Sequence, residues 1–224
     1  MCRLLLLILL VIAPLRAEPI PPELRAALDA LQTDAPRGWG FIQTSEGENH
    51  RRVEKYHPLG PEPARWTLLE LDGRAPTEAE ITDYRKKQTL RAGGQRAPNV
   101  KDQILPESAE QLSETATESV WRFALKPGSD DDTWAPHMAA TFTLHRPSRT
   151  ISRVELGSLG PFSPMFLTNV AEARTVMEYA LPEGDTPALL QRITVRVRGK
   201  AWFFRSLDSD LVVTYSDYQY AGKR

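Results

Sequence analysis

The sequence contains almost no cysteine. Among 224 residues the single cysteine is Cys2, which precedes an apolar run from Leu4 to Leu15. A lipoprotein acceptor cysteine would follow such a run, so lipidation is not indicated. After this first segment the chain has no disulfide, no thiolate nucleophile and no cysteine metal ligand. The folded part must therefore be held together by its core.

The chain also lacks any long apolar segment other than the one at its beginning. Arg3, the run Leu4–Leu15 and the sequence Leu15-Arg16-Ala17 are typical of a secretory signal peptide that is cleaved after Ala17. About 12 apolar residues are too few to cross a bilayer core of roughly 30 Å. We expect residues 18–224 to form one periplasmic domain without a transmembrane segment. An uncleaved N-terminal anchor is the alternative.

Neither sign of charge dominates the chain. The sequence has 28 Lys and Arg residues against 29 Asp and Glu residues. Loss of Arg3 and Arg16 with the signal peptide would leave 26 basic residues against the same 29 acidic ones. A nearly neutral chain has no general attraction for nucleic acid. The remaining 207 residues (224 minus 17) suffice for a single domain with a substantial core.

Motifs for catalysis and metal binding are missing. Gly157–Gly160 does not match the nucleophile elbow, and Gly38–Gly40 lacks the third glycine of a dinucleotide fingerprint. Asp130–Asp132 precede His137 and could hold a metal, but aspartates in an exposed turn more simply form the turn. We predict no catalytic residue, no cofactor and no metal. An enzyme of an unrecognised type stays as the third hypothesis.

Alternation of polar and apolar residues dominates the segment from Met138 to Tyr220. This period of two is typical of β-strands, and it is clearest in Thr150–Leu156 and Ile193–Arg198. Gly199-Lys200 is predicted to be a tight reversal, after which Ala201–Leu207 returns as a strand. The segment therefore predicts a run of antiparallel strands.

The first half of the chain mixes strands with helices. Leu24, Ala27, Leu28 and Leu31 share one helical face, and Thr77-Glu78-Ala79-Glu80 fits a capping box at the start of a second helix. The other predicted elements are strands at Trp39–Thr44, Arg51–Tyr56 (a polar edge strand), Arg65–Leu71 and Val120–Leu125, a mobile loop over 91–107, and a short acidic helix at Ser108–Leu112.

These elements predict an α+β protein. Its expected architecture is one strongly curved antiparallel sheet, an open half-barrel of about nine or ten strands, with two or three short helices against it.

Large apolar side chains on these strands are the candidate ligand-binding residues. They are Trp121, Phe123, Trp202 and Phe204, together with Phe162, Met165 and Phe166 on the proline-braced connection 159–166. They either line a concave pocket or fill the core. Arg196, Arg198 and Lys200 share one strand face and could contact an anionic group, although a solvated sheet face explains them equally well.

Several stretches carry a family resemblance. Trp66–Thr77, Pro161–Pro164, Val197–Ala201 and Tyr215–Tyr218 are similar to exported proteins of Gram-negative bacteria whose activity is not known. The strand-rich chain with inserted helices resembles the periplasmic lipoprotein-carrier half-barrel fold. That resemblance implies a concave sheet that holds acyl chains under helical lids, with residues 24–31 and 77–90 as the lids. It requires Arg122, Arg196 and Arg198 to face outward.

The sequence favours a soluble periplasmic binding protein. Its ligand would be an acyl chain or a lipidated protein in the cavity of the curved sheet. The alternative is an envelope interaction or sensor protein that binds another protein through a sheet edge or the Phe162 loop, without catalysis.

Overall fold

The computed structural model describes residues 20–32, 36–61, 64–92, 99–129, 132–202 and 204–222. The predicted signal peptide lies outside these residues. The described helices are α1 (Pro22–Ala30) and α2 (Glu78–Ala92), with three short 3-10 turns at Val100–Asp102, Pro106–Ser108 and Ala135–His137. The strands are β1 (Trp39–Gly47), β2 (His50–Tyr56), β3 (Trp66–Leu71), β4 (Glu110–Glu114), β5 (Glu118–Ala124), β6 (Met138–His145), β7 (Thr150–Ser158), β8 (Phe162–Met165), β9 (Thr168–Tyr179), β10 (Leu190–Ala201), β11 (Arg205–Ser206) and β12 (Ser209–Tyr220).

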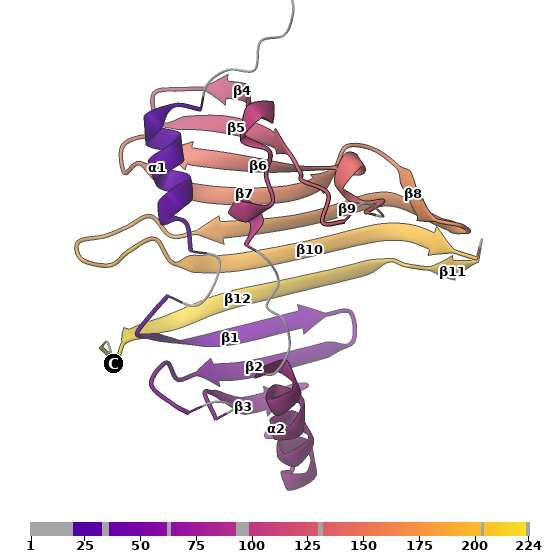
Figure 1. The fold of residues 1–224 in the computed structure, drawn as a ribbon. Helices are drawn as coiled ribbons and strands as arrows, with labels where there is room; N and C mark the ends of the chain where they lie inside the picture. Colours follow the sequence, from indigo (N-terminus) through magenta and orange to yellow (C-terminus); the bar gives the residue numbers. More distant parts are fainter. Residues whose placement is uncertain are drawn as a thin grey trace, which may run out of the picture.

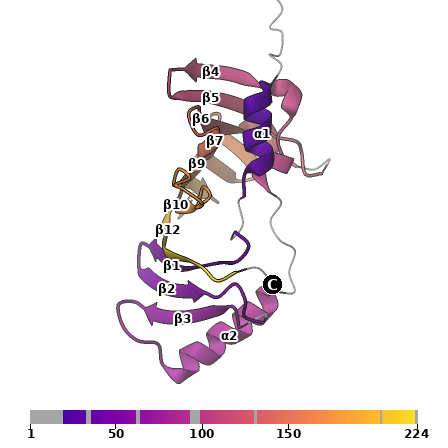
Figure 2. The same cartoon turned by 90° about the vertical axis from the view of Figure 1, so that its left-hand side faces the viewer.

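All of these strands belong to one open antiparallel sheet. Its order is β3-β2-β1-β12-β10-β9-β7-β6-β5-β4, with β8 paired to β9 and β11 paired to β10 (Figure 1). The sheet is curved and does not close on itself (Figure 2). The predicted fold class is therefore confirmed, and the sheet has 12 strands, which is the expected nine or ten plus the short strands β8 and β11.

Both helices lie on the same face of the sheet, at opposite ends. Helix α1 packs against β7, and α2 packs against β3 (Figure 1, Figure 2). We call this face the helix-bearing face. The strands between the two helices, namely β10, β12 and β1, are covered by neither of them. In the described part of the chain no helix has both the length and the apolar character needed to span a bilayer.

The main core lies under α1. Leu24 of α1 and Phe123, Phe142 and Val154 of β5, β6 and β7 are all 0% exposed. The rings of Phe123 and Phe142 meet edge to face, with centroids 5.6 Å apart. In β5, β6 and β7 these buried residues are apolar members of the alternating pattern, and they point to the helix-bearing face. The alternation that predicted the strands therefore also predicts which of their residues form the core. Burial of such side chains is the main stabilising contribution to the fold.

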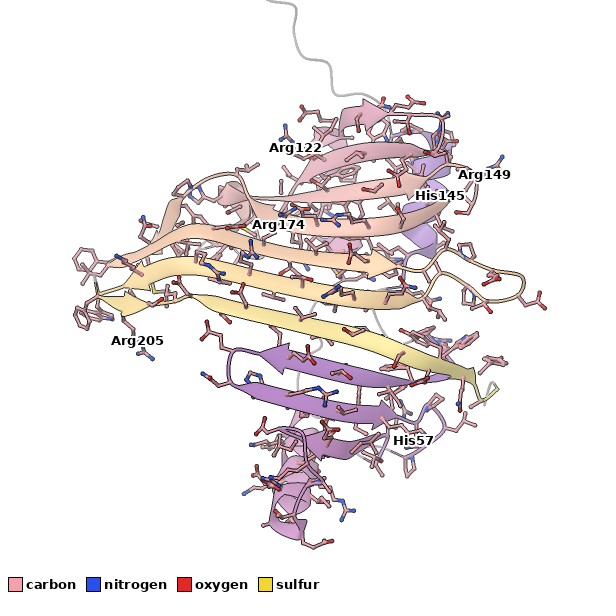
Figure 3. The ribbon with its side chains drawn as sticks, turned by 180° about the vertical axis from the view of Figure 1, so that it is seen from behind. His57, Arg122, His145, Arg149, Arg174 and Arg205 are labelled. Atoms are coloured by element: carbon pink, nitrogen blue, oxygen red, sulfur yellow. The ribbon has the colours of Figure 1, made fainter. Side chains whose placement is uncertain are left out.

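The opposite face of the sheet carries charged side chains that pair across strands. Arg174 Nε donates to Glu155 Oε1 at 2.8 Å, and Arg153 Nη1 donates to Glu178 Oε1 at 3.0 Å. Arg122 lies on the same face and pairs with Glu110 (Figure 3). Cross-strand pairs of this kind are compatible with a solvated sheet face. The resemblance required Arg122 to face outward, and it does.

Several local predictions were wrong. Residues Ser108–Leu112 were expected to be helical, yet β4 covers Glu110–Glu114. Segment 99–107 was expected to be mobile, but Val100 and Ile104 are buried against the core. Residues 93–98 of that loop lie outside the described residues. Strand β2 was expected at an edge, and it instead lies between β1 and β3.

The predicted capping box at the start of α2 is confirmed. Thr77 N donates to Glu80 Oε2 at 2.7 Å, and Glu80 N donates to Thr77 Oγ1 at 3.4 Å. Arg74 adds a two-pronged ion pair to the same carboxylate. These interactions hold the pKa of Glu80 down at about 2, with the Arg74 hydrogen bond as the largest cause. The capping box therefore fixes the residue at which α2 starts.

Candidate functional site

An aromatic cluster covers the helix-bearing face of β12, β1, β2 and β3. Phe41 is its centre: its ring stacks on Tyr56 at 5.0 Å and meets Trp66 and Tyr215 edge to face at 5.7 and 5.5 Å. The cluster, which we call the aromatic face, consists of Trp39, Phe41, Tyr56, Trp66, Tyr215 and Tyr218.

The register explains why these rings share one face. Phe41 is opposite Tyr56, and Tyr56 is opposite Trp66. A shift in the pairing of β1 with β12, between Gly40 and Ile42, brings Tyr218 to the same face as Tyr215. Phe41 is only 4% exposed, whereas the rings around it are half-buried. The aromatic face therefore presents ring surface to solvent around a buried centre.

Aliphatic side chains continue this surface toward α1. Ile193 is opposite Val213, and Val195 is opposite Leu211, so β10 and β12 place all four on the helix-bearing face. Val213 is buried, and the other three are half-buried. Ile193 also packs against the core cluster under α1, so a strip of apolar surface runs from the edge of that core to the aromatic face. Partly exposed apolar surface of this kind marks interaction sites more often than a scattered apolar residue does.

A buried carboxylate borders the aromatic face on the side of α2. Glu54 of β2 is 1% exposed. Tyr84 of α2 donates its hydroxyl to Glu54 Oε1 at 2.8 Å, while Arg52 Nε and Gln43 Nε2 donate to Glu54 Oε2 at 2.9 and 3.2 Å. A buried charge is tolerated only with such partners. The network therefore fastens α2 to the sheet through polar contacts.

Burial changes the acidity of the tyrosines around the site. It raises the pKa of Tyr215 to about 12, and the charge of Glu54 adds to that shift. Burial also raises the pKa of Tyr84 and of Tyr218. The Tyr218 hydroxyl donates to the Leu190 carbonyl at 2.6 Å. These phenols stay protonated at neutral pH, so they act as hydrogen-bond donors rather than as charges.

The predicted ligand-binding residues do not come together in one place. Trp121 and Phe123 are buried in the core under α1, at 3% and 0% exposure. Phe162 is buried in a smaller cluster with Val170, Ala173 and Met138. Its ring stacks on His137, with centroids 5.0 Å apart. These three predicted residues therefore fill the interior and do not line an open site.

The other four predicted residues are exposed at one end of the sheet. Met165 ends β8 and Phe166 follows it, and they are 63% and 89% exposed. Trp202 and Phe204 follow β10, and they are 63% and 87% exposed. Trp202 was predicted on a strand but lies in the turn between β10 and β11, because β10 runs through Gly199 to Ala201. We call these four residues the aromatic tip.

The predicted anionic contact residues differ in their partners. Arg196 Nε and Arg198 Nη2 both pair with Asp210, at 3.4 and 2.6 Å. The hydrogen bond to Asp210 raises the pKa of Arg198. No ion pair to Lys200 is found in the described part of the chain. Only Lys200 of the three is thus available to another anion.

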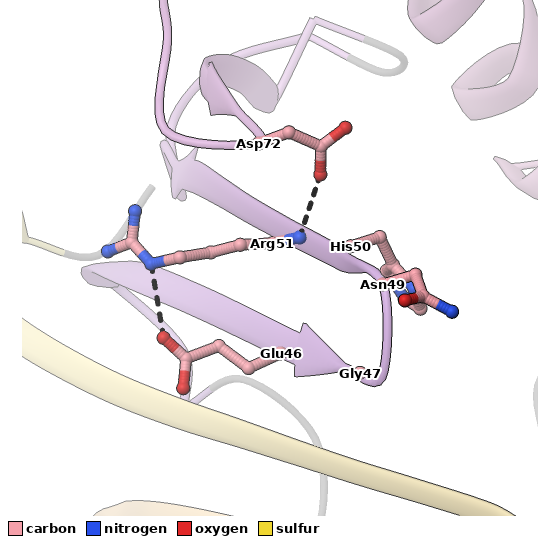
Figure 4. Close-up of a pocket in the computed structure, with 6 residues that line it drawn as sticks. All are labelled: Glu46, Gly47, Asn49, His50, Arg51 and Asp72. Carbon is pink, nitrogen blue, oxygen red and sulfur yellow. Dashed lines mark hydrogen bonds and ion pairs between the residues drawn. The ribbon is translucent and has the colours of Figure 1, made fainter.

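The hollows on the surface of the described residues include the following two. One of about 380 Å³ is lined by Glu46, Gly47, Asn49, His50, Arg51 and Asp72 around the β1–β2 turn (Figure 4). Arg51 N donates to Asp72 Oδ1 at 2.9 Å, and Arg51 Nε donates to Glu46 Oε1 at 3.1 Å. Arg51 also pairs with Glu70. Because Arg51 already pairs with the carboxylates around this hollow, we assign these residues a structural role in the β1–β2 turn.

A second hollow, of about 430 Å³, lies at the base of the aromatic tip. It is lined by Ser163, Leu167, Thr168, Asn169 and Lys200.

A metal-binding arrangement is not found in the residues that the structure describes. No group of three or more His, Cys, Asp or Glu side chains is placed there to hold a metal. Asp130 and Asp131 of the acidic turn lie outside those residues. Asp132 instead accepts hydrogen bonds from the backbone of Gly128, Trp134 and Ala135, and these lower its pKa. It therefore shapes the turn.

The aromatic face was missed at the level of sequence. Its signal was an aromatic residue at each of Trp39, Phe41, Tyr56 and Trp66, on three predicted strands. The order of those strands was needed to see that the rings meet.

Comparison with models of known protein families and with curated proteins finds no match. Among solved structures, the chain is similar to "GphF Dehydratase 1" at 10% identity and a TM-score of 0.17, covering 88% of this chain and 81% of that one. A variant of the same dehydratase made for improved crystallization gives the same identity and TM-score, with 87% and 81% coverage. Likeness at this level carries no argument about fold or function.

Proposed function

We propose that the protein is a non-catalytic periplasmic binding protein that holds an acyl chain or another elongated apolar ligand against the aromatic face. The observation that carries this proposal is the strip of half-buried rings and aliphatic side chains between α1 and α2. The ligand lies on this face, not in an enclosed cavity, because Trp121, Phe123 and Phe142 fill the interior beneath α1.

Affinity should depend on chain length. Each methylene removed from water contributes about 0.8 kcal/mol, which corresponds to about a fourfold gain in affinity per methylene. The gain should stop when the strip is filled. The Tyr56 hydroxyl and the remaining N–H groups of Arg52, at the border of the strip, supply donors for a polar end group of the ligand.

The experiment is a titration with monomeric saturated fatty acids of increasing length, followed by tryptophan fluorescence. Trp39 and Trp66 lie on the aromatic face and report on occupancy. Tyr56→Ala removes one ring and keeps both reporters, and it should weaken binding about tenfold, which is about 1.4 kcal/mol. Phe204→Ala is the matched control outside the face. An affinity that ignores chain length, or an equal loss in both variants, would overturn the proposal.

A further inference from the structure

The aromatic tip concentrates exposed apolar surface at one place. Of the six large apolar side chains that are more than 60% exposed among the described residues, four belong to the tip. The backbone joins its two turns, since Trp202 N donates to the Leu167 carbonyl at 2.8 Å. The two turns therefore form one projecting unit at the β8 and β11 end of the sheet (Figure 1).

Backbone conformation adds a second observation. Leu167 has φ of 62° and Trp202 has φ of 53°, in the left-handed region that favours glycine. A glycine at either turn would relieve the strain. The chain instead carries large apolar side chains there, which is expected where the side chain itself has a use.

Positive charge and hydrogen-bond donors lie at the base of the same unit. Lys200 lines the 430 Å³ hollow together with Ser163, Thr168 and Asn169. Arg205 projects at the same end of the sheet (Figure 3). Within the described residues neither cation has an ion pair, and the nearby Asp208 and Asp210 are engaged by Gly199 N and by Arg196 and Arg198.

We propose that the aromatic tip docks on a bilayer containing anionic phospholipid. Phe166, Trp202 and Phe204 enter the interface between headgroups and acyl chains, and Lys200 in the hollow contacts a lipid phosphate. Aromatic side chains beside cations are the composition that favours such interfaces. A stable protein partner needs about 800 Å² and some 20 residues per side, which two short turns do not provide. The proposal does not rest on the proposed function, because the tip lies outside the aromatic face.

The test is co-sedimentation of the chain without the predicted signal peptide, residues 18–224, with vesicles of phosphatidylcholine alone or mixed equally with phosphatidylglycerol. We expect binding to the mixed vesicles and a loss of at least tenfold in Phe166→Ser/Phe204→Ser. The matched control Leu90→Ser, on α2 and 70% exposed, should bind like the parent. Lys200→Glu should lose binding to mixed vesicles, while Lys86→Glu on α2 should not.

Circular dichroism is the control that each variant is folded. The fatty-acid titration should be unchanged in the tip variants. That titration separates failure of this proposal from failure of the proposed function. Inorganic phosphate added at millimolar concentration should leave vesicle binding intact, because insertion of the rings is required. The proposal would be overturned if the protein did not bind the mixed vesicles, or if Leu90→Ser lost as much binding as the tip variants. It would also be overturned if the tip variants lost binding to a protein partner while their vesicle binding stayed unchanged.

Discussion

Replacement of Tyr84 by phenylalanine tests how α2 is held on the sheet. The change removes the hydroxyl that donates to Glu54 Oε1 at 2.8 Å and leaves the ring in place. Both residues are buried, at 7% and 1% exposure, so water cannot easily replace the lost donor. A hydrogen bond to a charged group contributes about 1.5–3 kcal/mol. We therefore expect a loss of about 2 kcal/mol in the free energy of unfolding.

Urea denaturation followed by circular dichroism measures this loss. In a protein of this size, 1 kcal/mol lowers the melting temperature by about 2–4 °C, so Tyr84→Phe should lower it by about 4–8 °C. Tyr220→Phe is the matched control, because Tyr220 is 54% exposed and its change should stay within about 0.5 kcal/mol.

A double-mutant cycle with Glu54→Gln should show coupling of about 0.5–3 kcal/mol between the two side chains. Hydrogen exchange would show whether α2 opens before the sheet does. If Tyr84→Phe were as mild as Tyr220→Phe, the Glu54 network would not fasten α2, and the account of the site border would be wrong.

Three further predictions concern the rest of the molecule. Phe162→Ala should destabilise the protein by about 3–5 kcal/mol in urea titrations, because the ring is 5% exposed, whereas Phe166→Ala, at 89% exposure, should change stability by no more than about 0.5 kcal/mol. Glu80 should titrate near pH 2 by carboxyl NMR; since its pKa is lowered on folding, its stabilising effect is complete above the unfolded pKa of about 4.3 and is lost as pH falls through 2, and Glu80→Gln should remove that dependence. Tyr215 should ionise near pH 12 in ultraviolet titrations; because its pKa is raised, its contribution is present below about pH 10 and is lost as pH rises through 12, and Tyr215→Phe should remove that step.

The regular parts of the fold could be predicted because their signals are local. Helix α1 follows from an apolar stripe at Leu24, Ala27 and Leu28, and all three are buried. The start of α2 follows from Thr77 and Glu80, which make the hydrogen bonds that a capping box requires. Strand β9 was not singled out, because Val176 and Met177 are both buried and interrupt the alternation.

Strand β2 shows how a long-range contact defeats a local signal. The sequence His-Arg-Arg-Val-Glu-Lys-Tyr indicates a solvated edge. In the structure β2 is internal, and Glu54 is among the most buried residues. Its burial depends on Tyr84, 30 residues further along the chain, and on Arg52 and Gln43. No pattern within β2 contains that information, so the carboxylate that borders the site could not be predicted.

Gly199 and Trp202 show why Trp202 and Phe204 of the aromatic tip were predicted on a strand. A glycine followed by a polar residue indicates a reversal, and Gly199-Lys200 fits that pattern. Gly199 is instead required inside β10, because a Cβ there would lie 2.5 Å from the Asn169 carbonyl oxygen of β9. The chain reverses three residues later, with Trp202 in a conformation that favours glycine. The sequence thus places its glycine where the backbone of β9 comes close, and it places a tryptophan at a turn position where glycine would have the least backbone strain. The turn itself does not require a tryptophan, so the feature to explain is the tryptophan side chain.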